Sequence, residues 1–196
     1  MVSSIVVIHE MVTLTSPLAL SEASFKLFAP RLYERYREVL SGVRVRDGNL
    51  RPPFENNVFA AATFNLGGDV TTLIHTDHLN YAPGWCAIVA LGKFDPDKGG
   101  HLIIWDLGIA IRFPPGSLIF LPSAILRHSN VALAPGDTRY SFTQYTAGGI
   151  FRWSACGFQS QRSFLAQGGQ HEVTGWERWQ SAITQFSTVA ELSGTS

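Results

Sequence analysis

The sequence predicts a mainly β fold: an antiparallel sandwich or barrel, with helices before and after it. A chain of 196 residues can bury a core of its own without disulfides or metals. Hydrophobic residues make up 45% and charged residues 15% of the chain, which is typical of a well-buried globular protein. Between residues 58 and 145, short apolar runs alternate with Gly, Pro and Asp, without helical periodicity between them. Strands that follow one another without helices pair in antiparallel sheets.

The N-terminal region, residues 1–54, contains one clear helical pattern. Pro30 suits the first position of a helix, and Gly42 is expected to end it. Apolar side chains recur between them at spacings of three and four, while Glu and Arg occupy the other positions. We therefore expect a helix that packs through one face and is solvated on the other.

The core of the fold is expected in residues 55–160. The candidate strands are 58–66, 70–75, 86–91, 102–105, 110–113, 117–121, 127–133 and 138–145. Turn-forming segments separate them, among them Gly67-Gly68-Asp69 and Pro114-Pro115-Gly116. The C-terminal region, 161–196, contains a helical pattern over 176–192 that we expect to pack outside the sheet. We interpret residues 1–196 as one domain with these three parts.

Charge and hydropathy exclude several classes of protein. The net charge is zero and the pI is near 7, so a strong sequence-independent nucleic-acid binder is not indicated, although Arg44, Arg46, Arg51, Arg152 and Arg162 leave a local basic face open. The apolar runs fall far short of the roughly 20 residues that span a membrane. The N-terminus lacks a secretion pattern, so we expect a nuclear or cytoplasmic protein. Cys86 and Cys156 form no metal-type pair and are expected to be buried free thiols.

The chemistry concentrates in the histidines, most clearly in His75-Thr76-Asp77-His78. Side chains two apart on a strand share a face, so His75 and Asp77 can present an imidazole and a carboxylate together. His128 lies 51 residues after Asp77 on a later candidate strand. Two imidazoles and one carboxylate are the ligand set of non-haem Fe(II) oxygenases, with positions left open for cosubstrate and O2.

A second pair of polar residues follows His128. Arg139 comes eleven residues after it, and Ser141 two residues later. Alternation along a strand places both on one face, where a guanidinium and a hydroxyl can hold a single carboxylate. An isolated His-x-Asp occurs by chance in roughly a fifth of chains of this composition, so the ordered set carries the interpretation and the single motif does not.

This order of residues resembles the Fe(II)- and 2-oxoglutarate-dependent dioxygenases, whose fold is a double-stranded β-helix, or jelly roll. Over residues 55 to 160 the surrounding sequence resembles a fungal group related to the ten-eleven translocation and J-binding-protein (TET/JBP-like) DNA oxygenases. The segments that carry this resemblance include Asn57-Val58-Phe59-Ala60, Gly99-Gly100-His101-Leu102, Arg127-His128-Ser129-Asn130 and Arg139-Tyr140-Ser141-Phe142-Thr143-Gln144-Tyr145.

The resemblance implies a ligand set, a cosubstrate and a substrate. His75, Asp77 and His128 would hold Fe(II), while Arg139, assisted by Ser141, would bind the distal carboxylate of 2-oxoglutarate. The reaction implied is oxidative decarboxylation of 2-oxoglutarate with O2, coupled to hydroxylation of a C–H bond. The implied substrate is the methyl of 5-methylcytosine or a related base in DNA, extruded from the duplex. DNA binding is expected to be weak or to need a partner.

Substrate contacts are expected in the turn that follows the metal ligands, at Asn80, Tyr81 and Trp85. A well-packed loop anchored by Trp85 is an equal alternative for this turn. Three alternatives to a DNA oxygenase also stay open: a dioxygenase acting on a small molecule or protein side chain, a non-catalytic jelly-roll binding module, and a metallo-β-lactamase-like hydrolase. The last matches His-x-His-x-Asp-His only in part, because position 73 is Leu.

Overall fold

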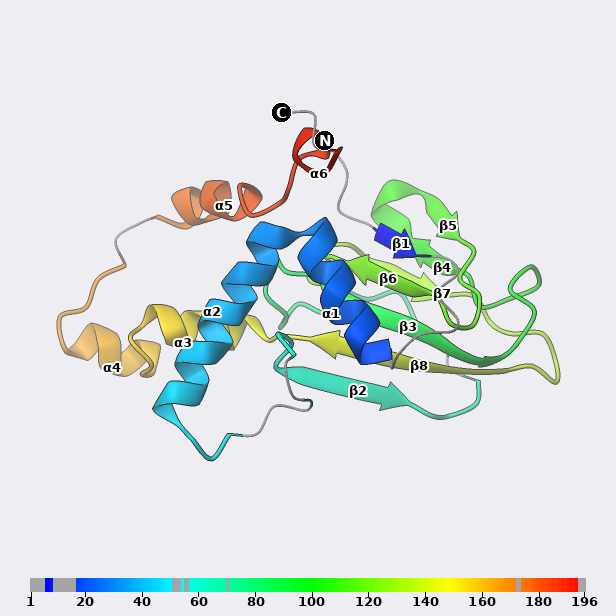
Figure 1. Cartoon of the computed structure of the whole chain (residues 1–196), viewed down its shortest axis with the longest axis horizontal. Helices are drawn as coiled ribbons and strands as arrows, with labels where there is room; N and C mark the ends of the chain where they lie inside the picture. Colours follow the sequence, from blue (N-terminus) through cyan, green and yellow to red (C-terminus); the bar gives the residue numbers. More distant parts are fainter. Residues whose placement is uncertain are drawn as a thin grey trace.

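The computed structural model describes residues 6–8, 17–50, 54, 57–69, 71–171 and 174–193. Two antiparallel sheets form its centre (Figure 1). The larger sheet has the order β1-β6-β3-β8-β2, and the smaller sheet has the order β5-β4-β7. The strands are β1 (Val6–Ile8), β2 (Ala61–Asn65), β3 (Cys86–Lys93), β4 (Leu102–Ile104), β5 (Ile109–Ile111), β6 (Leu118–Leu121), β7 (His128–Asn130) and β8 (Thr138–Tyr145).

The strand order is that of a jelly roll. Strands β2, β8, β3 and β6 lie side by side in the larger sheet, while the chain between them crosses to the smaller sheet. The segment that contains His75 extends the smaller sheet past β7 through a single bridge between His75 and His128. Each sheet thus collects strands that are distant in sequence, as in a double-stranded β-helix. The predicted mainly β jelly roll with flanking helices is confirmed.

Strands β3 and β6 of the larger sheet divide their side chains between two apolar cores. One core lies between the sheets, where Ala90 and Ile119 pack with Leu102, Ile104 and Phe113. The other lies on the opposite face, where Val89 and Phe120 belong to a cluster that includes Phe25 and Tyr36 of the N-terminal helices. Alternation along β3 and β6 accounts for this division, because neighbouring residues point to opposite faces.

Two N-terminal helices, α1 (Pro17–Phe28) and α2 (Pro30–Arg46), cover the outer face of the larger sheet (Figure 1). The helix predicted to start at Pro30 is confirmed, but it continues past Gly42 and ends at Asp47, whose backbone N–H donates to Val43 O. Glycine serves close packing at position 42, because a Cβ there would lie 2.4 Å from the ring of Phe158. Helix α1 lies outside the sequence prediction.

In the described residues after the sheet, the chain forms the short helices α3 (Gly148–Ala155), α4 (Gln161–Ala166), α5 (Gly175–Ile183) and α6 (Val189–Ser193). The prediction of one helix over 176–192 is therefore wrong. Thr188 explains the break: its hydroxyl accepts from Glu191 N, and the Glu191 carboxylate accepts from Thr188 N, so a new helix starts there.

The predicted strand over 70–75 is also wrong for the described part of that segment, which excludes Val70. In this segment, the side chain of Asn130 accepts hydrogen bonds of the kind that a paired strand would otherwise form. Its Oδ1 accepts from both the backbone N–H and the hydroxyl of Thr72, at 2.8 and 2.7 Å. Only at His75 does the backbone pair with β7. A short 3-10 turn, η1 (Trp105–Leu107), joins β4 to β5.

Both cysteines are buried free thiols, as predicted. Among the described residues, no helix has the length and hydropathy that crossing a membrane requires.

Candidate metal centre and cosubstrate cavity

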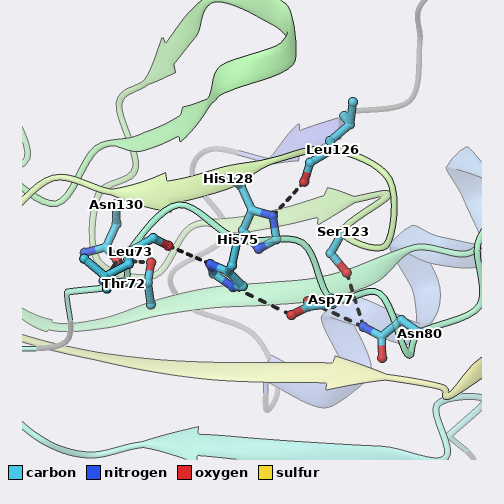
Figure 2. A network of polar contacts seen from close by, with 9 residues as sticks. All are labelled: Thr72, Leu73, His75, Asp77, Asn80, Ser123, Leu126, His128 and Asn130. Atoms are coloured by element: carbon cyan, nitrogen blue, oxygen red, sulfur yellow. Dashed lines mark hydrogen bonds and ion pairs between the residues drawn. The ribbon is translucent and has the colours of Figure 1, made fainter.

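His75, Asp77 and His128 bring their donor atoms together at one end of the space between the sheets. One ligand atom from each residue lies within 4.8 Å of the other two. Donors that each sit about 2.1 Å from one ion are about 3–4 Å apart, so small side-chain movements bring all three onto a single metal. The centroids of the two imidazole rings lie 4.3 Å apart, and Figure 2 shows both rings beside the Asp77 carboxylate.

Hydrogen bonds to the backbone fix which nitrogen of each imidazole is available. Nδ1 of His75 lies 2.7 Å from Leu73 O, and Nδ1 of His128 lies 2.9 Å from Leu126 O. A carbonyl oxygen only accepts, so each Nδ1 is the donor, and Nε2 is the nitrogen left to bind a metal. This arrangement is common behind metal-binding histidines, because it fixes both the tautomer and the direction of the ring.

The protein also favours the neutral form of His128, which metal binding requires. His128 is buried, and burial lowers its pKa, with a smaller contribution in the same direction from His75. Asp77 supplies the negative charge of the group, with Oδ1 3.6 Å from His75 Nε2. Two imidazoles and one carboxylate suit a divalent transition metal with positions left open to other ligands.

A cavity of about 410 Å³ opens beside these residues. One wall contains Asp77, Asn80 and His128, and the opposite wall consists of inward side chains of the larger sheet. The second wall is mostly polar: Thr63, Asn65, Ile88, Thr143 and Tyr145. Small-molecule sites in proteins commonly have volumes of about 300–1,000 Å³.

Arg139 and Ser141 lie on the same face of β8 as Thr143 and Tyr145, which line the cavity. Both are buried, and Asn65, which lines the cavity, donates a hydrogen bond of 2.9 Å to the Ser141 hydroxyl. Burial lowers the pKa of Arg139, but an arginine remains charged at neutral pH. A buried guanidinium next to a cavity suits a carboxylate ligand. Asn65 was not a sequence candidate, because only the pairing of β2 with β8 places it opposite Ser141.

The three expected substrate contacts occupy different places. Asn80 lines the cavity and hydrogen-bonds next to Asp77. The ring of Tyr81 stacks on that of Phe151, with 3.6 Å between the ring centroids, and its hydroxyl hydrogen-bonds to the side chain of Gln185. Trp85 is 3% exposed in the core against the N-terminal helices, which corresponds to the packed-loop alternative. Neither Tyr81 nor Trp85 is among the residues that line the cavity.

No protein-family profile and no curated protein matches the sequence. Among solved structures, the chain is similar to NgTET1 in complex with 5mC DNA, with 15% identity and a TM-score of 0.46 over 70% of this chain and 56% of that one. It is also similar to the viral collagen prolyl hydroxylase vCPH from Paramecium Bursaria Chlorella virus-1. The 2OG complex of vCPH has 15% identity and a TM-score of 0.32 over 45% of this chain and 61% of that one, and a truncated form has a TM-score of 0.33. The chain thus spans a little over half of the NgTET1 chain.

The strand arrangement bears on the hydrolase alternative. Between β2 and β8, the described part of the chain contains no α-helix, only the η1 turn. Metallo-β-lactamase-like folds interleave helices with their strands, so the hydrolase alternative does not fit this structure.

Proposed function

We propose that this protein is an Fe(II)- and 2-oxoglutarate-dependent dioxygenase that hydroxylates a C–H bond. The observation that carries the proposal is the grouping of two imidazoles and one carboxylate beside a cavity, with a buried arginine on the same face of β8 as the cavity lining. The donor set fits Fe(II), because it joins imidazole and carboxylate ligands and leaves other coordination positions free.

In this proposal each residue has one task. His75, Asp77 and His128 hold the metal, and the backbone carbonyls behind the two imidazoles keep each Nε2 directed at it. Arg139, with Ser141 and Asn65 beside it, binds the distal carboxylate of 2-oxoglutarate and thereby orients the cosubstrate. The bound iron would supply the redox and O2 chemistry that protein side chains lack.

The substrate we propose is the methyl of 5-methylcytosine or a related base in DNA. The sequence resemblance to TET/JBP-like oxygenases supports this choice. The rim of the cavity also suits a flat, neutral group: Leu79 is 73% exposed and His78 lies beside it. A base extruded from the helix can stack on such side chains. Arg127 pairs with Asp106, so contacts to phosphates would fall to other basic residues.

Succinate formation tests the reaction. Protein reconstituted anaerobically with Fe(II) is exposed to air and 2-oxoglutarate, with and without methylated DNA. We expect succinate from the wild-type chain and from Asp97→Ala, whose carboxylate pairs with Arg112 on the surface, but none from Asp77→Ala. Full turnover by Asp77→Ala would refute the proposed metal centre.

Mass spectrometry of the DNA separates the substrates. Oxidised 5-methylcytosine in duplex or single-stranded DNA would support the base. Turnover that depends on Asp77 but leaves both DNA forms unchanged would point to a small molecule or a protein side chain. Binding of metal and 2-oxoglutarate without any turnover would favour a non-catalytic binding module.

A further inference from the structure

The turn formed by residues 77–80 places the side chain of Asn80 next to the carboxylate of Asp77. The backbone N–H of Asn80 donates to Asp77 O at 2.8 Å, which closes a four-residue turn. Nδ2 of Asn80 then lies 3.5 Å from Asp77 Oδ2 and 3.2 Å from the hydroxyl oxygen of Ser123 (Figure 2). A carboxylate only accepts hydrogen bonds, so the amide must turn its NH2 group toward Asp77.

Ser123 anchors this turn from the other side. It follows β6, is 1% exposed, and accepts the backbone N–H of Asp77 with its carbonyl oxygen at 2.8 Å. Its hydroxyl accepts from Asn80 in the same place. Ser123 therefore contacts both ends of the turn from a buried position.

A third segment holds the turn on its far side. Asn80 forms an isolated bridge with Ala147, and Gly148 N donates to Leu79 O at 2.8 Å. The backbone of the turn is thus fixed by two neighbouring segments. The orientation of the Asp77 side chain depends on what contacts its two oxygens.

Those two oxygens have different surroundings. Oδ1 faces the imidazole of His75, at 3.6 Å from Nε2, while Oδ2 faces the amide of Asn80. Engagement of Oδ2 leaves Oδ1 as the oxygen available to a metal, and it restricts rotation of a carboxylate whose side chain is 34% exposed. A ligand that is already oriented loses less conformational entropy on binding.

We propose that Asn80, anchored by Ser123, is a positioning residue that presents Asp77 to the metal through Oδ1 alone. This inference rests on the metal centre of the proposed function. It differs from the substrate contact expected from the sequence, because it predicts an effect on metal affinity in the absence of any substrate.

The test is metal affinity without 2-oxoglutarate or substrate. Co(II) binding to the full chain is measured by competition with a chelating dye, and the visible absorption of bound Co(II) reports its coordination. Loss of a partner that orients a metal ligand typically weakens metal binding about 10–100-fold. We expect a loss in that range for Asn80→Ala, with a changed Co(II) spectrum, and a smaller loss for Ser123→Ala.

Two matched variants and one double variant sharpen the result. Ser41→Ala on α2 and Asn49→Ala in the turn after it remove the same atoms at exposed positions. Both should leave the Co(II) affinity unchanged. If Ser123 acts through Asn80, the double variant of Asn80→Ala and Ser123→Ala should bind Co(II) no more weakly than Asn80→Ala alone, within about twofold.

Other results of these measurements would contradict the proposed role of Asn80 or the metal centre itself. Co(II) affinity of Asn80→Ala within twofold of wild type, together with reduced turnover of substrate, would overturn the proposal and make Asn80 a substrate contact. If Asn80→Ala does not fold, wild-type affinity and an unchanged spectrum in Ser123→Ala would overturn it. Wild-type chain that binds no Co(II) would remove the metal centre and this proposal together. Wild-type chain that binds Co(II) but gives no succinate with Fe(II) would refute the proposed function alone.

Discussion

Substitution of Gly92 by alanine tests the packing behind the arginine of the cavity. Gly92 lies on β3 opposite Arg139 of β8, and its φ is +108°, a conformation that L side chains rarely adopt. A Cβ at this position would lie 2.4 Å from Thr138 O and 3.1 Å from Arg139 Cα. The backbone strain alone costs about 1–3 kcal/mol, and forced overpacking of this kind costs about another 1–3 kcal/mol.

Gly136 provides the matched control. Its φ is +89°, but a Cβ there would meet nothing within 4 Å. Gly136→Ala therefore carries the strain without the clash, and Gly92→Ala should be less stable than it by about 1–3 kcal/mol. In a chain of this length, that difference corresponds to a Tm lower by about 2–12 °C, measurable by thermal denaturation followed by circular dichroism.

The functional consequence follows from the same contact. Displacement of β8 at Arg139 should weaken binding of 2-oxoglutarate to Gly92→Ala, measured by calorimetry with Co(II) bound, while Gly136→Ala binds as wild type. Equal Tm values for the two variants would refute the close approach of β3 and β8 at Arg139 and, with it, our account of how Arg139 is held in place.

Three further outcomes are expected. Ser21→Ala should lower the free energy of unfolding by about 1–3 kcal/mol in urea denaturation, because it removes a hydrogen-bond donor to the buried Oε1 of Gln144, whereas Ser41→Ala at an exposed site should change it by less than about 0.5 kcal/mol. Burial raises the pKa of Cys86 from 9.0 to about 12, so the stability that depends on the neutral thiol should be complete below pH 9 and lost as the pH rises toward 12. The native thiol should also resist alkylation at pH 8 until denaturant is added, and rapid labelling of the native chain would contradict this. Arg139→Lys should raise the Kd for 2-oxoglutarate about tenfold or more, because an ammonium cannot form the paired contacts of a guanidinium with a carboxylate, and an unchanged Kd by calorimetry would place the cosubstrate elsewhere.

The parts of the fold that depend on local pattern were predictable from the sequence. Strands β3, β6 and β8 follow from apolar runs between turn formers, and alternation along β8 placed Arg139 and Ser141 on one face. His75 and Asp77 lie close together, as predicted, but for a different reason. They do not lie on a regular strand, because the chain makes one bridge at His75 and turns at Asp77.

The parts that depend on distant contacts were not predictable. Asn65 reaches the cavity only through the register of β2 on β8, and Ser123 meets Asp77 only because the loop after β6 passes beside it. Trp85 illustrates the same limit, since an aromatic residue after a metal segment suits a substrate contact and a core equally well. Its burial against the N-terminal helices depends on helix α1, which the sequence pattern did not indicate.

The most direct test of the metal and cosubstrate site is an anaerobic crystal structure of the full chain with Mn(II) and 2-oxoglutarate. We expect one metal ion bound by Nε2 of His75, Nε2 of His128 and a single oxygen of Asp77, with the distal carboxylate of 2-oxoglutarate at Arg139. A metal ion held by other residues, or 2-oxoglutarate bound away from the cavity, would contradict the account.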